Sequence, residues 1–357
     1  MAAPSKARGR GAVSNATGRF ESMTTEAFDD GWTGDDEAPA PLRTTISAEA
    51  TRTIIARNDS PDIGFDQSIN PYRGCEHGCI YCYARPSHAY MGLSPGLDFE
   101  SRLFFKPEAA RLLQRELSKP SYEPKLIHIG ANTDPYQPQE RRLRITRQVL
   151  EVLQRFNHPV SVLSKSALVA RDVDILGPMA AMGLARAAVS ITTLDRKLAR
   201  SMEPRAATPE RRLWALRQLT AAGVPSIVMF APVIPGLNDH ELEAVLQRAA
   251  EAGATGAGYV VLRLPLEIKD LFQEWLESDH PNRASRVMSL VRQMRGGKDY
   301  DAQWGMRMKG QGPIAELIAK RFAIAKRRFG LDAERTPLDV TQFRVPPKAG
   351  DQLDLFG

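Results

Sequence analysis

Cysteine is scarce in this chain of 357 residues: Cys75, Cys79 and Cys82 are its only cysteines, and all three fall within eight residues. An odd number so closely spaced cannot form a disulfide framework, so we expect a reducing compartment, the cytoplasm. The sequence also lacks the long apolar run of a transmembrane helix and the compact apolar segment of a secretory signal, which argues against membrane insertion and export. Short internal repeats are not evident, which sets aside solenoids and propellers.

The charge balance is mildly basic, with 48 Lys and Arg against 42 Asp and Glu. The excess comes from residues 283–328, which hold twelve Lys or Arg and three acidic residues. Such a segment favours a polyanionic partner, and DNA is the one that we consider. The plainer alternative is a solvated helix face.

Composition divides the chain into four regions. Residues 1–45 are poor in large apolar side chains, so we predict a disordered N-terminal arm. Residues 46–265 alternate between β-rich and helical patterns and form the predicted catalytic domain. Residues 266–335 are predicted to be helical and basic, and residues 336–357 to be a flexible tail.

Within residues 46–265 the apolar runs are short and regularly spaced. They lie at residues 126–130, 160–163, 188–191, 227–233 and 259–264, after a first strand that leads into Gly74. Between them lie helical patterns: Thr208 and Pro209 predict a helix start, and Asn238 with Glu241 resembles a capping box. Strands separated by helices predict parallel βαβ units. About six units predict an α/β fold, a partial (βα)6 TIM-type barrel with a helical, basic C-terminal extension.

The cysteines form a C-x3-C-x2-C loop after the first predicted strand. Three thiolates on so short a loop can converge on one soft metal centre, and Gly74 and Gly78 allow the backbone to bend around it. A [4Fe–4S] cluster held by three cysteines leaves one iron open to chelate a substrate or cofactor. The alternative is structural zinc with His77 as fourth ligand, but structural zinc usually draws its ligands from two separated pairs.

This loop resembles the signature of the radical S-adenosylmethionine (SAM) superfamily, and its context over residues 70–85 resembles the branch that includes spore photoproduct lyase. The resemblance implies a radical SAM enzyme with a [4Fe–4S] cluster and SAM as cofactors. It also implies a reductant such as flavodoxin or ferredoxin. An electron delivered to the cluster would break a C–S bond of SAM, and the resulting 5′-deoxyadenosyl radical would abstract a hydrogen from substrate.

Three cofactor contacts follow from the resemblance near the first strands. Tyr81 matches the aromatic position that packs near adenine, with core packing as the alternative. Thr133 and Asp134 match the motif that accepts hydrogen bonds from the methionine ammonium. Their alternative is a helix-capping turn before Pro135. Barrel enzymes concentrate function at strand ends, which favours the cofactor role.

Further contacts are implied on the later strands. Lys165 matches a lysine that contacts the methionine carboxylate, with a solvated loop lysine as the alternative. Ser190 matches a cofactor-contacting serine, and Val233 is a candidate for contact with adenine, although simple turn chemistry also explains its surroundings. Glu203 could hydrogen-bond ribose or substrate.

The substrate is left open by one departure from the resemblance. Spore photoproduct lyase uses a further cysteine as hydrogen donor, and this chain has none. The candidates for a radical relay are Tyr83 and Tyr136, with Tyr259 as a third tyrosine. We expect an enzyme of DNA repair or modification. One alternative is a radical enzyme that acts on a protein, RNA or small molecule, and another is a cluster protein without catalytic activity.

The last residues of the chain carry a second resemblance. Gln352, Leu353, Asp354, Leu355 and Phe356 resemble the peptide by which bacterial replication and repair proteins engage the sliding clamp. The leucines and the phenylalanine are apolar anchors in a polar tail, as expected of a peptide that binds a groove. The alternative is that they fold back onto the barrel. The resemblance predicts the bacterial sliding clamp as a partner and DNA as the substrate.

Overall fold

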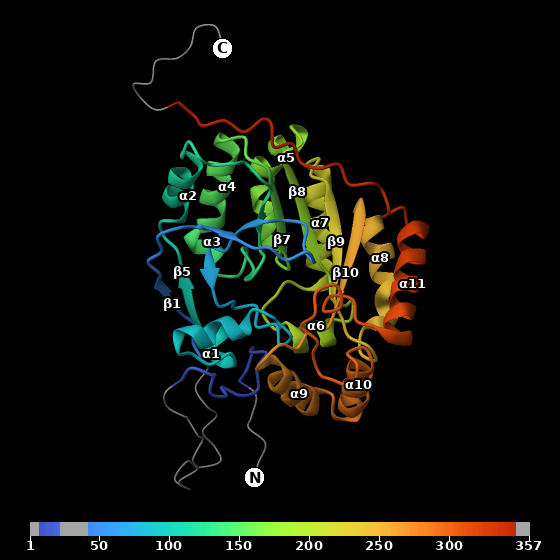
Figure 1. The fold of residues 1–357 in the computed structure, drawn as a ribbon. Coiled ribbons are helices and arrows are strands. Elements are labelled where there is room, and N and C mark those ends of the chain that lie inside the picture. The colour runs from blue at the N-terminus through green and yellow to red at the C-terminus, as the bar shows by residue number, and fades with distance from the viewer. Residues whose placement is uncertain (1–6, 22–41, 348–357) are drawn as a thin grey trace.

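The computed structural model describes residues 7–21 and 42–347 and is built around a seven-stranded sheet (Figure 1). The spatial order of the strands is β10-β9-β8-β7-β6-β3-β2. Six of them run parallel: β3 (Gln67–Ile69), β6 (Ile127–Ile129), β7 (Val160–Ser164), β8 (Ala185–Ser190), β9 (Ser226–Val233) and β10 (Gly256–Val261). The seventh, β2 (Ile55–Arg57), pairs antiparallel with β3 at the edge.

This sheet confirms the predicted partial barrel. Each of the five predicted apolar runs overlaps one of the strands from β6 to β10. The buried apolar side chains of these strands belong to one core. Among the described residues β10 and β2 do not pair with each other, so the barrel remains open along that side.

Helices cover the outer face of the sheet, where α2, α4, α5, α7 and α8 stand side by side (Figure 1). Their apolar stripes face the strands, as in α4, which buries Val149, Leu150 and Leu153. The outer helices are α2 (Ala109–Leu117), α4 (Ile145–Arg155), α5 (Val173–Ala181), α7 (Pro209–Ala221), α8 (Leu242–Glu251) and α11 (Gly312–Arg328), the last packed on α8.

The predicted helix signals differ in outcome. Thr208 caps α7 as expected, because its side chain accepts a hydrogen bond from the amide of Arg211. The capping box at Asn238 and Glu241 is wrong. Asn238 instead accepts from the amide of Ile234, and the Glu241 carboxylate binds residues after β8.

Short elements gather at the carboxyl ends of the barrel strands. A three-stranded sheet there consists of β1 (Thr45–Ala48), β5 (Arg102–Phe105) and β4 (Tyr72–Arg73). The helical elements that connect or follow the strands are η1 (Arg85–Met91), α1 (Leu97–Ser101), α3 (Glu140–Leu143), η2 (Ala167–Asp172), α6 (Arg196–Met202), η3 (Asp239–Glu241), α9 (Ile268–Asp279) and α10 (Pro281–Gln293). Of these, α1, α6, α9 and α10 lie together at one end of the molecule in Figure 1.

The predicted disordered N-terminal arm is wrong for residues 7–21. Arg10 and Ala12 are buried, and the Glu100 carboxylate accepts hydrogen bonds from the amides of Gly11 and Ala12. The segment is thus fixed by backbone hydrogen bonds to a buried acid, which its apolar-poor composition does not reveal. Residues 42–45 also belong to the fold, where β1 begins. The rest of the predicted arm lies outside the described residues.

The predicted flexible tail is wrong up to residue 347. Phe343 packs against the rings of Tyr122, Phe156 and His158, and the amide of Arg344 donates to the Phe156 carbonyl. The candidate clamp-binding peptide, residues 352–356, lies outside the described residues. Within the described ranges no helix is both long and apolar enough to cross a membrane.

Candidate cofactor site at the cysteine loop

The cysteine loop runs from the end of β4 to the start of η1. Gly74 and Gly78 both have positive φ, 70° and 67°, a conformation that favours glycine. Cys75 and Cys79 are buried, and Cys82 is partly exposed. The two glycines therefore allow the turns that bring three thiols together at the mouth of the barrel.

The surroundings of the thiols bear on what they can hold. Burial raises the pKa of Cys75, of Cys79 and of Cys82, and nearby Asp134 raises that of Cys75 further. The positive charge of Lys165 lowers the pKa of Cys79 and of Cys82 and so partly offsets the effect of burial. Three thiolates here require a compensating cation, so the donor set suits a metal centre.

The geometry does not favour the zinc alternative. Within residues 7–21 and 42–347, no three His, Cys, Asp or Glu side chains are placed to hold one metal ion. The imidazole of His77 instead faces Asp134, with 3.4 Å between Nδ1 and Oδ2. Three thiols on one loop are also a donor set that suits an iron–sulfur cluster, which binds each thiolate at a different iron.

A buried arginine fixes the loop from within. The Arg85 guanidinium donates to the carbonyls of Cys79, at 2.9 Å, and of Gly78, at 3.2 Å, and forms a fully buried ion pair with Glu100. Glu100 is the acid that also binds the amides of Gly11 and Ala12. One ion pair therefore connects the cysteine loop to α1 and to the N-terminal segment.

A second buried network lies behind Tyr81. The Tyr81 hydroxyl donates to Glu203, which also accepts from Thr192 at 2.6 Å and pairs with Arg212. Burial alone would raise the pKa of Glu203, but the charges of Arg212 and Lys165 lower it. Lys165 Nζ lies 5.7 Å from the centre of the Tyr81 ring, so the structure brings these two predicted residues together.

Asp134 connects two strand ends with the cysteine loop. Its Oδ1 accepts hydrogen bonds from the Ser164 hydroxyl at 2.7 Å and the Tyr136 amide at 2.9 Å, and its Oδ2 from the Lys165 amide at 2.7 Å. Burial alone would raise the pKa of Asp134, but His77, the Lys165 amide and the Ser164 hydroxyl lower it to about 2. The carboxylate is therefore ionised and already bound by protein groups.

The other predicted cofactor contacts lie at the same strand ends. The Thr133 hydroxyl donates to the Tyr72 carbonyl at 2.9 Å, and that of Ser190 to the Ala231 carbonyl at 3.2 Å. Val233, the last residue of β9, is fully buried. All three residues are thus held at the end of the sheet that carries the cysteine loop.

The tyrosines considered for a radical relay lie in different surroundings. Tyr83 follows Cys82, is 45% exposed and has the Arg263 guanidinium 5.3 Å from its ring centre. Tyr136 is fully buried below Arg171. Tyr259 packs on the outer helix α11 through Phe322. Only Tyr83 both borders the cysteine loop and reaches solvent.

Two arginines of this region could not be identified from the sequence. Arg212 lies on α7, nine positions after the Glu203 that it neutralises, and Arg263 follows the last barrel strand. Neither belongs to a motif. For Arg263 the only available signal is its place after a predicted strand.

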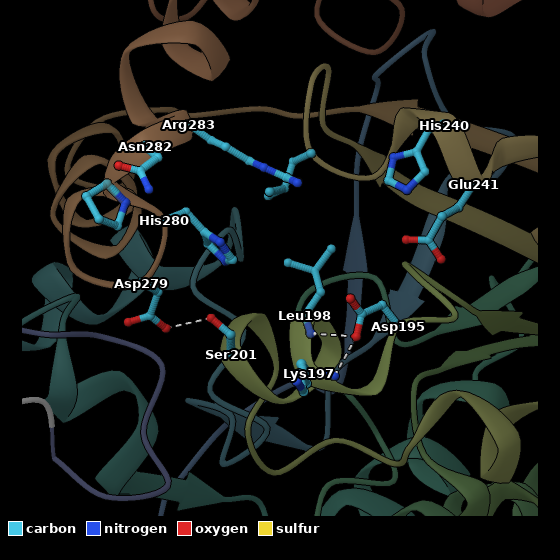
Figure 2. Close-up of a pocket in the computed structure, with 12 residues that line it drawn as sticks. Asp195, Lys197, Leu198, Ser201, His240, Glu241, Asp279, His280, Asn282 and Arg283 are labelled. Carbon is cyan, nitrogen blue, oxygen red and sulfur yellow. Dashed lines mark hydrogen bonds between the residues drawn. The ribbon is translucent and has the colours of Figure 1, made fainter.

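A separate cavity of about 800 Å³ lies on the flank of the mouth, between α6, η3 and the start of α10 (Figure 2). Figure 2 shows charges of both signs around it, including Asp195, Lys197, Glu241 and Arg283, and a hydrogen bond from Ser201 to Asp279. None of the residues predicted to bind cofactor lines it. It is therefore distinct from the cysteine-loop site.

The open barrel and its loop of three thiols define an α/β protein with a candidate metal centre at the carboxyl ends of its strands. The sequence model of the Radical SAM superfamily matches residues 69–249. The chain belongs to this superfamily, whose members are enzymes, and membership implies SAM and an iron–sulfur cluster.

The chain is also similar to other proteins in sequence and in structure. An uncharacterised protein of Mycobacterium tuberculosis is 37% identical over 294 residues, which cover 80% of this chain and 81% of the relative. An uncharacterised protein of Methanocaldococcus jannaschii is 28% identical over 173 residues, 48% of this chain and 62% of the relative. Spore photoproduct lyase in complex with dinucleoside spore photoproduct gives a TM-score of 0.53 at 15% identity, covering 80% of this chain and 78% of that one. The last match shows a shared fold.

Proposed function

We propose that this radical SAM enzyme holds a [4Fe–4S] cluster on Cys75, Cys79 and Cys82, cleaves SAM reductively and acts on DNA. The observation that carries the first part is the buried loop of three thiols beside Lys165 and Tyr81. When bound, the cluster would supply an electron to SAM, and the product of that cleavage would abstract a hydrogen from the substrate.

The residues of the chain bind and orient the reactants. Lys165 offers a cation beside Tyr81 for the methionine carboxylate, while Tyr81 is held by its hydrogen bond to Glu203. Asp134 fixes the backbone of Lys165 and faces His77 of the cysteine loop. Asp134 already accepts three hydrogen bonds, so the methionine ammonium would be a fourth donor to this carboxylate. Tyr83 remains the relay candidate open to substrate.

The choice of DNA rests on the sequence. The basic residues of the C-terminal third support a polyanionic substrate, although Arg307 and Arg321 are neutralised by Asp62 and Glu243. The terminal residues 352–356 resemble a sliding-clamp peptide, which points to replicating or repaired DNA. A clamp-bound radical SAM enzyme would act on a base or sugar of that DNA.

The test is anaerobic reconstitution with iron and sulfide, followed by reductant and SAM. We expect about four irons per chain, as a [4Fe–4S] site requires, and formation of 5′-deoxyadenosine. The variant with all three cysteines changed to Ala should show neither, and turnover in that variant would refute the cluster assignment. Damaged DNA should raise 5′-deoxyadenosine formation and be altered itself, as mass spectrometry of its digested nucleosides would show. An unchanged rate and unaltered DNA would refute the DNA substrate alone.

A further inference from the structure

Arg263 lies at the mouth of the barrel, two residues after the end of β10. The amide of Leu262 still donates to the Val233 carbonyl of β9, at 2.9 Å, so the chain follows the sheet almost to Arg263. The residue therefore occupies the carboxyl end of the last barrel strand. Barrel enzymes place substrate-binding groups at these ends.

A loop over residues 299–310 crosses the open side of the barrel at this level. On one side the Met308 carbonyl accepts from the amide of Val261, at 2.9 Å. On the other side the Gly305 amide donates to Asp62, at 2.7 Å, and Arg307 pairs with the same carboxylate. Asp62 belongs to the connection between β2 and β3, so the loop joins the two edges that do not pair with each other.

Arg295 fixes this loop to the strand. It is 2% exposed and donates to the carbonyls of Met306 and Leu262, both at 2.8 Å. The backbone of Leu262, which directly precedes Arg263, is thus held at both its amide and its carbonyl. The chain next to Arg263 is therefore ordered before any substrate arrives, which lowers the entropy cost of binding.

The charge of Arg263 is not neutralised by an ion pair in the described part of the chain, unlike that of other arginines around the site. Arg85, Arg205 and Arg212 pair with Glu100, Glu76 and Glu203 respectively. Arg263 makes only weak polar contacts, at 3.4 Å to the Tyr300 hydroxyl and 3.6 Å to the Met308 sulfur.

The neighbouring acid Asp62 does not change this conclusion. The amide of Gly305, Arg307 and Arg263 all lower the pKa of Asp62, so the two groups are neighbours. The Asp62 oxygens are nevertheless bound by Gly305 and Arg307. Arg263 therefore retains N–H donors that an incoming anion can satisfy.

We propose that Arg263 binds a backbone phosphate of a nucleic-acid strand that lies across the Tyr83 side of the cysteine loop. This inference rests on the proposed function and identifies where the strand enters the site. The planar guanidinium offers paired donors that match a phosphate. Two exposed aromatic side chains provide faces on which bases of a single strand can stack. They are Tyr83, which is 45% exposed, and Trp304 of the loop over residues 299–310, which is 51% exposed.

The test measures binding of a fluorescently labelled single-stranded DNA oligonucleotide to the reconstituted protein by anisotropy, over a series of salt concentrations. Arg263→Gln removes the charge, and Arg248→Gln, on the exposed face of α8 beside Glu251, is the matched control. We expect Arg263→Gln to weaken binding about tenfold at low salt and to reduce the slope of log affinity against log salt by roughly 0.7, the value for one phosphate of a single strand. Arg248→Gln should match the wild type.

The outcomes separate this inference from the proposed function. Equal affinity and slope for Arg263→Gln and the wild type would overturn the role of Arg263 and leave the DNA substrate standing. If the wild type cleaves SAM but binds no strand, both the role of Arg263 and the DNA substrate would be overturned. Thymidine monophosphate that competes as well as the strand would assign the site to a free nucleotide and overturn the strand. SAM cleavage without DNA should be unchanged in Arg248→Gln. Arg263→Lys, which keeps the positive charge, should bind the strand better than Arg263→Gln.

Discussion

Gly11 packs so closely against Gly78 of the cysteine loop that a Cβ on Gly11 would lie 1.8 Å from the Gly78 carbonyl oxygen. The amide of Gly11 donates to Glu100 at 2.9 Å, and Glu100 pairs with the Arg85 that holds the loop from within. The N-terminal segment therefore covers the backbone of the cysteine loop and excludes water from it.

Gly11→Ala should displace this segment, because no side-chain motion can relieve a clash with backbone. We expect the variant to fold, to bind iron and to lose its visible iron–sulfur absorbance in air several times faster than the wild type. Gly64→Ala is the control, since a Cβ at Gly64 meets nothing within 4 Å. Equal decay of the Gly11→Ala and wild-type clusters would show that the segment does not shield the loop.

Glu203→Gln should destabilise the protein through Arg212. The substitution keeps the shape of the side chain but leaves the buried Arg212 without a counter-ion, which costs about 3 kcal/mol. It also weakens the acceptor for the Tyr81 hydroxyl, so SAM affinity should fall. Denaturant unfolding and SAM binding measure the two effects, with the exposed Glu251→Gln as control. Wild-type stability of Glu203→Gln would contradict the assignment of this network.

Lys165→Ala should separate cofactor binding from cluster binding. Lys165 lies over Tyr81 but is not a cluster ligand, so iron content should match the wild type. Loss of the cation facing the methionine carboxylate should weaken SAM binding about tenfold, which corresponds to ~1.4 kcal/mol. Lys125→Ala, where Lys125 pairs with Asp66 away from the mouth, should bind SAM normally. Unchanged SAM affinity in Lys165→Ala would remove this residue from the cofactor site.

The terminal peptide gives a test that requires no cluster. A synthetic peptide that ends in residues 352–357 should bind a purified bacterial sliding clamp, because Leu353, Leu355 and Phe356 can fill an apolar groove. Phe356→Ala should abolish most of the affinity, whereas Asp354→Ser, which keeps the motif, should retain it. No binding at high micromolar peptide would remove the clamp from the list of partners.

The barrel could be predicted from the sequence because its signals are local. Each strand from β6 to β10 is an apolar run bounded by turn residues, and the cysteine spacing identifies the metal loop without any knowledge of the fold. The burial of residues 7–21 has no such signal. It depends on Glu100, some ninety positions away, accepting hydrogen bonds from the amides of Gly11 and Ala12.

One local pattern was misleading, and one site residue had no pattern at all, for the same reason. Asn238 and Glu241 have the spacing of a capping box, but the Glu241 carboxylate binds the Thr193 hydroxyl and the Leu194 amide after β8. Arg263 belongs to no motif, and its relation to Tyr83 exists only once the barrel brings β10 near the cysteine loop. Long-range polar contacts therefore account for most of what the sequence did not predict.

His158 should make stability depend on pH. It is fully buried beside Tyr122 and Phe343, and burial lowers its pKa to about 4. The unfolded chain, with a histidine pKa near 6.5, binds a proton that the fold excludes, so stability is full above pH 6.5 and falls as the pH drops toward 4. At pH 5 this residue alone should cost about 2 kcal/mol relative to pH 7. Denaturant unfolding of His158→Gln should show a shallower loss between pH 7 and 5 than the wild type, whereas the exposed His240→Gln should not. Parallel pH profiles for His158→Gln and the wild type would mean that His158 is protonated in the fold.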